Sequence, residues 1–153
     1  MPIEIGDFVF FEVLPTASSA LSKAVGDTAT SAGLPNIFHV GIVVENENSS
    51  TKTDLSKVRL VHASTAKGVI EESLDRLTER FEKQGEKHLL HFRAVLLPPN
   101  VKKKAASEAR ANDKGERCFY CCQLVRFAYN KASNKIIFAD NRMLSFKDAT
   151  GAR

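Results

Sequence analysis

Short apolar runs rich in aromatic and β-branched residues recur through the first two-thirds of the chain, with polar segments between them. Runs of this length and content predict β-strands. We expect strands at FVFFEV (8–13), FHVGIVVEN (38–46), VRLVHAS (58–64) and HLLHFRAVLL (88–97), and a short extended piece at KGVIEES (67–73). FHVGIVVEN has the length and β-branched content of a central strand. VRLVHAS follows it as a partner strand, after a polar connection.

Helical patterns lie between and after these runs. The segment SLDRLTERFEK (73–83) places apolar residues at helical spacing, which predicts an amphipathic helix. KKKAASEARAND (102–113) is rich in alanine and is expected to close near Gly115. A further helix is expected over 119–132, with an apolar face formed by Leu124, Phe127 and Ala128. A short helix over ALSKAV (20–25), a loop over 27–36 and a last apolar piece of undefined structure (136–146) complete the prediction.

The order of these elements predicts one α+β domain over residues 1–153, with antiparallel strands first and a cysteine-bearing helix late. A chain of 153 residues is long enough for a real core and too short for two domains of ordinary size. The sequence contains neither an internal repeat nor a recognisable linker.

Composition narrows the class of protein. Apolar residues make up 43% of the chain and charged residues 26%, which is ordinary for a soluble globular domain. The net charge of +4 is spread along the chain apart from Lys102–Lys104, which we expect to be a solvated helix start, so nucleic-acid binding is not expected. No apolar run has the length of a membrane span. The first residues predict a strand rather than a signal peptide, so we expect a cytoplasmic protein or one exported by a signal-independent route.

The cysteines are Cys118, Cys121 and Cys122, all within five residues. An odd number of cysteines without a secretion signal argues against a disulfide framework and favours reduced thiols. Cys118 and Cys121 have the C-x-x-C spacing of half a zinc site or of a redox pair, but the sequence offers no second compact ligand pair. A zinc-binding module without catalytic activity therefore stays open as an alternative.

A cysteine and two histidines suggest a catalytic group. A thiol needs help to ionise at neutral pH, and a helix start together with an imidazole provides it. Cys121 lies at the start of a predicted helix, His39 lies on a predicted strand, and His62 is able to fix the tautomer of His39. Each residue also has a structural alternative: cysteines in apolar helices and histidines in strands more often pack in the core. His88 and His91 show no partner pattern and are expected to be strand or surface residues.

Four motifs in a fixed order carry a resemblance. GDFVFF (6–11), HVGIVV (39–44) and VHAS (61–64) resemble the strand series of the NlpC-type cysteine endopeptidases of the cell wall. In that family the nucleophilic cysteine precedes these strands, whereas here YCCQLV (120–125) follows them. YCCQLV resembles the Tyr-Cys-Ser-Glu-Leu-Val helix start of the circularly permuted branch, the YiiX-like papain-fold amidases, to which lecithin:retinol acyltransferase is related.

The resemblance implies a permuted papain-like fold in which an antiparallel sheet packs against the helix that carries the nucleophile. Carried over by position, Cys121 matches the nucleophile, His39 the general base and His62 the third polar residue. Cys122 and Gln123 stand where the branch commonly has Ser and Glu.

The same resemblance implies an activity. It implies a cysteine amidase or peptidase that acts on peptide amide bonds of the cell wall and needs no cofactor. A delivered antibacterial effector would have such an activity, and an immunity or delivery partner would then be expected. A lipid acyltransferase or thioesterase with the same site is the alternative.

Overall fold

The architecture was established in a computed structural model that describes residues 3–14, 37–48, 53–64, 67–111 and 121–133; within the last range the side chains of residues 121–123 and 126 are outside the description. The helix expected over 20–25, the loop 27–36, the segment 136–146 and Cys118 lie outside the described residues.

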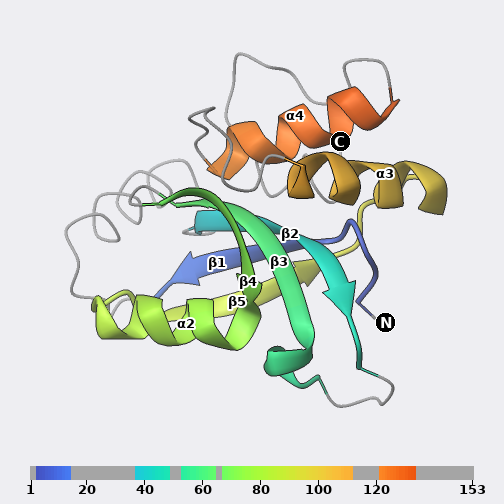
Figure 1. The fold of residues 1–153 in the computed structure, drawn as a ribbon. Helices are drawn as coiled ribbons and strands as arrows, with labels where there is room; N and C mark the ends of the chain where they lie inside the picture. Colours follow the sequence, from blue (N-terminus) through green and yellow to red (C-terminus); the bar gives the residue numbers. More distant parts are fainter. Residues whose placement is uncertain (1–2, 15–36, 49–52, 65–66, 112–120, 134–153) are drawn as a thin grey trace.

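One antiparallel sheet of five strands forms the centre of the fold, in the order β4-β3-β2-β1-β5 (Figure 1). The strands are β1 (Phe8–Val13), β2 (Ile37–Asn46), β3 (Val58–Ser64), β4 (Gly68–Ser73) and β5 (His88–Arg93). The four predicted strands are confirmed, the extended piece expected over 67–73 forms β4, and β2 is the central strand. β5 ends at Arg93 rather than at residue 97, because its ladder with β1 stops at the pair Phe8–Arg93, where β1 begins.

Both faces of the sheet are buried, which explains why the first strand is a continuous apolar run instead of an alternating one. Phe8 and Phe10 point into the core on one face, and Val9 and Phe11 point into the core on the other. The alternation continues through the sheet and therefore fixes which side each polar residue of the strands faces.

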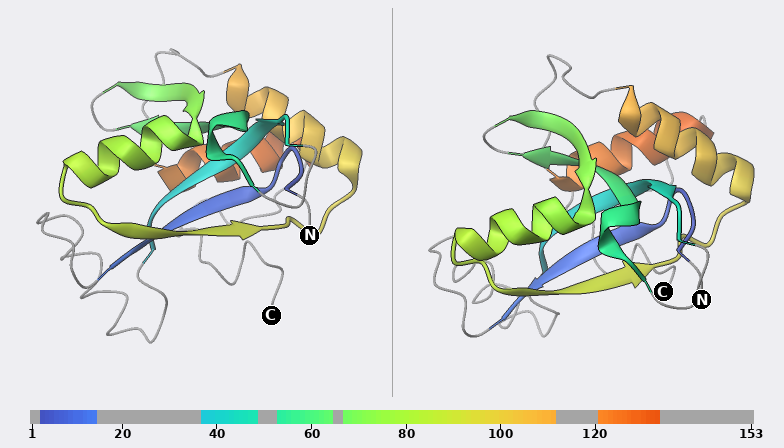
Figure 2. Two further views of the ribbon diagram at one scale, coloured as in Figure 1. Left: turned by 90° about the horizontal axis from the view of Figure 1, so that it is seen from below. Right: turned by 60° about the horizontal axis from the view of Figure 1, so that its bottom comes forward.

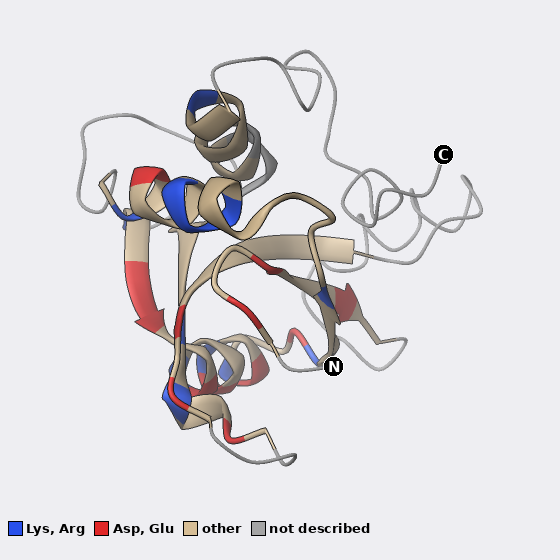
Figure 3. Ribbon diagram, turned by 90° about the vertical axis from the view of Figure 1, so that its right-hand side faces the viewer, with Lys and Arg blue, Asp and Glu red and all other residues tan. Residues whose placement is uncertain are grey.

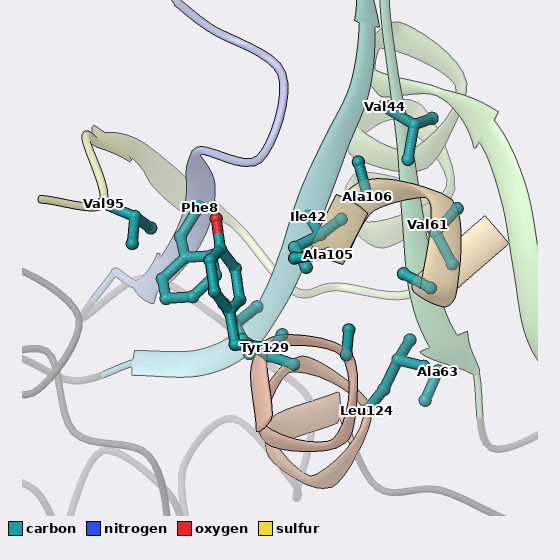
Figure 4. Close-up of a cluster of buried hydrophobic side chains, with 14 of the residues drawn as sticks. Phe8, Ile42, Val44, Val61, Ala63, Val95, Ala105, Ala106, Leu124 and Tyr129 are labelled. Carbon is teal, nitrogen blue, oxygen red and sulfur yellow. The ribbon is translucent and has the colours of Figure 1, made fainter. Parts of the chain in front are cut away.

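Helix α2 (Leu74–Lys83) covers one face, and helices α3 (Pro99–Arg110) and α4 (Cys121–Ser133) cover the other (Figures 1 and 2). The described chain is thus an α+β fold of three layers. Figure 4 shows the core on the α3–α4 side, where Leu124 and Tyr129 of α4 pack against strand residues such as Ala63 and Phe8. Among the described residues, no helix combines the length and apolar character that crossing a bilayer requires.

Three details differ from the expectations. Helix α3 begins at Pro99, three residues earlier than predicted, because proline is well tolerated at the first helical position. Lys102, expected in solvent, is 3% exposed and forms ion pairs with Asp7 and Glu4. Phe127 is only partly buried in α4, and Tyr129 occupies the core instead.

Candidate functional site

The two predicted site histidines lie side by side on neighbouring strands. Nε2 of His39 on β2 is 3.0 Å from Nδ1 of His62 on β3. Both rings lie on the α2 side of the sheet: Val40 and Val61, their neighbours in sequence, point into the opposite core, and the ring of His39 packs against Phe81 of α2. The strands thus hold the two imidazoles in contact at the end of the sheet where β2 begins and β3 ends.

A glutamate and an arginine that the sequence analysis did not single out extend this pair. Nε2 of His62 lies 2.5 Å from Oε2 of Glu72, on β4. Arg80 of α2 donates two hydrogen bonds to the same carboxylate, at 2.9 Å to Oε1 and 2.6 Å to Oε2. In Figure 3 the acidic end of β4 runs into α2. The site is therefore a hydrogen-bonded series of four side chains, Arg80–Glu72–His62–His39.

The carboxylate of Glu72 is strongly held in its ionised form. Burial raises the pKa of Glu72, but hydrogen bonds from His62 and Arg80 outweigh burial and lower the pKa to about 2. An ionised carboxylate only accepts hydrogen bonds, so Nε2 of His62 donates to Glu72. With one proton on the His62 ring, its Nδ1 is an acceptor, and Nε2 of His39 donates to it.

This pattern leaves Nδ1 of His39 as the unprotonated nitrogen of the pair. Among the described residues none hydrogen-bonds to that atom. Burial lowers the pKa of His39 well below its ordinary value, and the neighbouring His62 and Arg80 lower it further. His39 is therefore neutral at pH 7, with a free lone pair on Nδ1, which is the state a general base requires.

A pocket of about 160 Å³ opens beside the histidines. Its wall combines aromatic rings with charged and polar side chains, contributed by Phe38, His39, His62, Ala63, Ser64, Lys67, Arg80, Phe81, Gln84 and Glu86. The rings of Phe38 and Phe81 are 5.2 Å apart and form an apolar side next to His39. The pocket therefore has room for a small part of a substrate directly at the imidazole pair.

Cys121 is the first residue of α4, two residues after the predicted helix start, and its side chain lies outside the described residues. Helix α4 packs on the sheet face opposite to the histidines. Its first turn nevertheless lies over the end of the sheet where β2 begins (Figure 1). Leu124 lies beside Ala63 in Figure 4, and Ala63 also lines the histidine pocket. The structure thus brings His39 and His62 together and leaves the position of the thiol undescribed.

His88 and His91 lie on β5, as expected for strand residues. The ring of His88 packs against Phe81 at 5.8 Å, and its Nδ1 donates to the carbonyl oxygen of Glu86. His91 lies 3.4 Å from Oε2 of Glu12. Within the described ranges, no three histidine, cysteine or acidic side chains are grouped in a way that would hold a metal ion.

Comparisons of the chain with protein-family models, with curated proteins and with solved structures found no match.

Proposed function

We propose that the protein is a cysteine amidase or peptidase of the permuted papain-like type, with Cys121 as nucleophile, His39 as general base and His62 as the residue that orients His39. The observation that carries the proposal is the hydrogen-bonded histidine pair, which leaves Nδ1 of His39 free and unprotonated at the wall of a pocket. Nδ1 of His39 is able to take a proton from a nucleophile, and the hydrogen bond to His62 holds the imidazole in place for that transfer.

In the proposed reaction, Nδ1 of His39 takes the proton of the Cys121 thiol, and the sulfur forms a bond to the carbonyl carbon of an amide. The imidazolium returns the proton to the amine nitrogen as the carbon–nitrogen bond breaks, which leaves a thioester. Water then gives a proton to Nδ1 while its oxygen attacks the thioester carbonyl. The sulfur departs as thiolate and recovers the proton, and the acid product leaves.

The reaction requires the thiol to reach His39 around the end of β2, because α4 and the histidines lie on opposite faces of the sheet. Two observations support this route. The first turn of α4 lies over that end of the sheet, and the pocket includes Ala63, which faces the α4 core. Backbone N–H groups at the start of α4 would then stabilise the oxyanion of the tetrahedral intermediate.

Cell-wall peptides are the proposed substrates, in keeping with the resemblance of the four motifs to NlpC-type endopeptidases. An acyl ester or thioester is the alternative substrate for the same chemistry. Mass spectrometry of cell-wall fragments and of lipid extracts, each incubated with wild type and with Cys121→Ala, distinguishes the two. New peptide termini that depend on Cys121 support the amidase, and acyl transfer or release supports the alternative.

Thiol reactivity tests the nucleophile directly. We expect iodoacetamide to alkylate Cys121 faster than Cys118 or Cys122 between pH 6 and 7, because an imidazole base favours the thiolate. His39→Ala should remove that difference in rate, and Cys122→Ser is the matched control that should keep it. Equally slow labelling of all three cysteines, with zinc bound in stoichiometric amount and lost in Cys118→Ala, would show a zinc module instead.

A further inference from the structure

The carboxylate of Glu72 has partners on both sides. Arg80 occupies both oxygens from α2, and Nε2 of His62 occupies Oε2 from the sheet. His62 itself is 1% exposed, so water offers its ring no alternative partner. The bidentate contact with Arg80 fixes the plane of the carboxylate, and the carboxylate fixes the ring of His62.

A pair of neutral imidazoles joined by one hydrogen bond has two arrangements of protons. In one, His39 donates from Nε2 to Nδ1 of His62, and Nδ1 of His39 is bare. In the other, His62 donates from Nδ1 to Nε2 of His39, and the proton of His39 moves to Nδ1, where it blocks the base. The ionised Glu72 permits only the first arrangement, because it needs a proton on Nε2 of His62.

We propose that Glu72, clamped by Arg80, is a positioning residue that sets the direction of the His62–His39 hydrogen bond and keeps Nδ1 of His39 free. The arrangement of protons follows from the geometry of the four side chains alone; its effect on catalysis rests on the proposed function. Neither Glu72 nor Arg80 is expected to touch the reacting atoms.

A matched control lies next to Glu72 in the sequence. Glu71 has a side chain of similar burial, with 15% exposed against 12% for Glu72, and it also binds two cations, Arg59 and Arg110. Its side chain forms ion pairs with these two arginines and hydrogen-bonds neither site histidine, since neighbouring residues of a strand point to opposite faces. Glu71→Gln therefore removes the same charge and a similar ion pair without touching the histidine series.

The experiment measures the tautomer of each imidazole by ¹⁵N NMR at neutral pH. The chain has four histidines, so His88→Gln and His91→Gln variants suffice to assign the site pair. We expect both His39 and His62 to carry the proton on Nε2 in wild type and in Glu71→Gln. In Glu72→Gln the amide also donates, so a large fraction of His62 should shift to the Nδ1–H form, and His39 with it.

Unchanged tautomers in Glu72→Gln, or the same change in Glu71→Gln, would overturn the inference. If circular dichroism shows that Glu72→Gln does not fold, the wild-type spectrum carries the test, because a proton on Nδ1 of either site histidine would contradict the arrangement that Glu72 imposes. Arg80→Met removes the clamp but leaves an acceptor carboxylate, so it should preserve both tautomers. A mixture of tautomers in the wild-type protein would equally overturn the inference.

Activity provides a second readout that a purely structural role would not change in the same way. Glu72→Gln should lower kcat/KM by a factor on the order of 10² to 10⁴. The acid limb of the pH–rate profile of Glu72→Gln should move to lower pH. The negative charge of Glu72 raises the pKa of His39, whereas Arg80, His62 and the nearby His88 lower it, so removing Glu72 leaves only the groups that lower it. Lys67 and Glu86, the other charged groups of the pocket wall, are unchanged in every variant. A folded wild-type protein without turnover would count against the proposed function, and the tautomer measurement would still decide this inference.

Discussion

Nζ of Lys102 lies 2.6 Å from Oδ1 of Asp7, and both side chains are almost completely removed from solvent. This pair ties helix α3 to the turn that precedes β1. Removing one member of a buried ion pair leaves the other charge uncompensated, which typically costs about 3–5 kcal/mol.

We therefore predict that Lys102→Met lowers the free energy of unfolding by about 3 kcal/mol or more, measured by urea denaturation. Lys103→Met, at the exposed neighbouring position, is the control and should stay within about 0.5 kcal/mol of wild type. Equal effects of the two substitutions would mean that the contact with Asp7 contributes nothing to stability.

The hydroxyl of Tyr129 donates a hydrogen bond to the carbonyl oxygen of Gly6, inside the core shared by α4 and β1. Burial, and then the negative charge of Asp7, raise the pKa of Tyr129 far above its ordinary range. In an alkaline titration followed by phenolate absorbance, Tyr129 should ionise only as the protein unfolds. Tyr129→Phe should delete that late phase and cost about 1–3 kcal/mol, because the buried carbonyl loses its donor. A phenolate signal from Tyr129 in the folded protein would contradict the prediction.

The low pKa of His39 makes stability depend on pH in a direction that can be worked out. The unfolded chain protonates this histidine below about pH 6.5, whereas the folded protein resists protonation. The unfolded state then binds more protons, so stability falls as the pH decreases from about 6.5 toward the lowered pKa. His39→Gln should flatten this fall, measured as the urea midpoint at a series of pH values. A slope identical to that of wild type would rule out the contribution of His39.

Glu72 adds a second, more acidic step. Its contribution is complete above the ordinary glutamate pKa of about 4.3 and is lost as the pH falls toward about 2. In Glu72→Gln this more acidic loss should be smaller, whereas the fall that begins near pH 6.5 should remain. The two variants thus separate the two steps in the same denaturation series.

Gly41 lies on β2, on the face of the sheet that carries the site histidines. A Cβ atom at this position would overlap Cδ1 of Leu60 and lie 3.5 Å from Cβ of His62. Gly41→Ala should cost about 1–3 kcal/mol from overpacking. The cost should shrink by at least about 0.5 kcal/mol when Leu60→Ala has already removed the overlapping atom. Strict additivity in this double-mutant cycle would show that the overlap is relieved elsewhere.

The strands and helices were predictable because their signals are local. The run FVFF and the β-branched HVGIVV carry strand content in their own residues, and the spacing of Leu74 and Leu77 carries the helix. Lys102 was wrongly expected in solvent, because its partner Asp7 is 95 positions away and nothing in the run of three lysines distinguishes the first from the others. Long-range pairing decides such cases, and a single sequence does not contain it.

Glu72 was missed for a related reason. The hairpin register pairs His62 with Ile70, which places Glu72 two residues further along on the same face of the sheet. Pairing VRLVHAS with KGVIEES in this register would have identified the glutamate, but the register depends on a turn whose type the sequence does not reveal. Nε2 of His39 and Nδ1 of His62 lie 3.0 Å apart, and the catalytic roles of His39, His62 and Cys121 stay predictions.

The position of His39 on the middle strand limits how the protein adapts to what it binds. Phe11 of β1 is its ladder partner on one side, and β3 holds the same strand on the other. A displacement of the backbone at His39 would strain its ladder with β1, and β3 holds the same strand from Ile42 onward, so the strand provides a fixed base for the imidazole. A substrate must therefore place its reacting group at His39, because the histidine does not move to meet it. We expect substrates to be distinguished by how far they extend past Phe38 and Phe81, the aromatic side of the pocket.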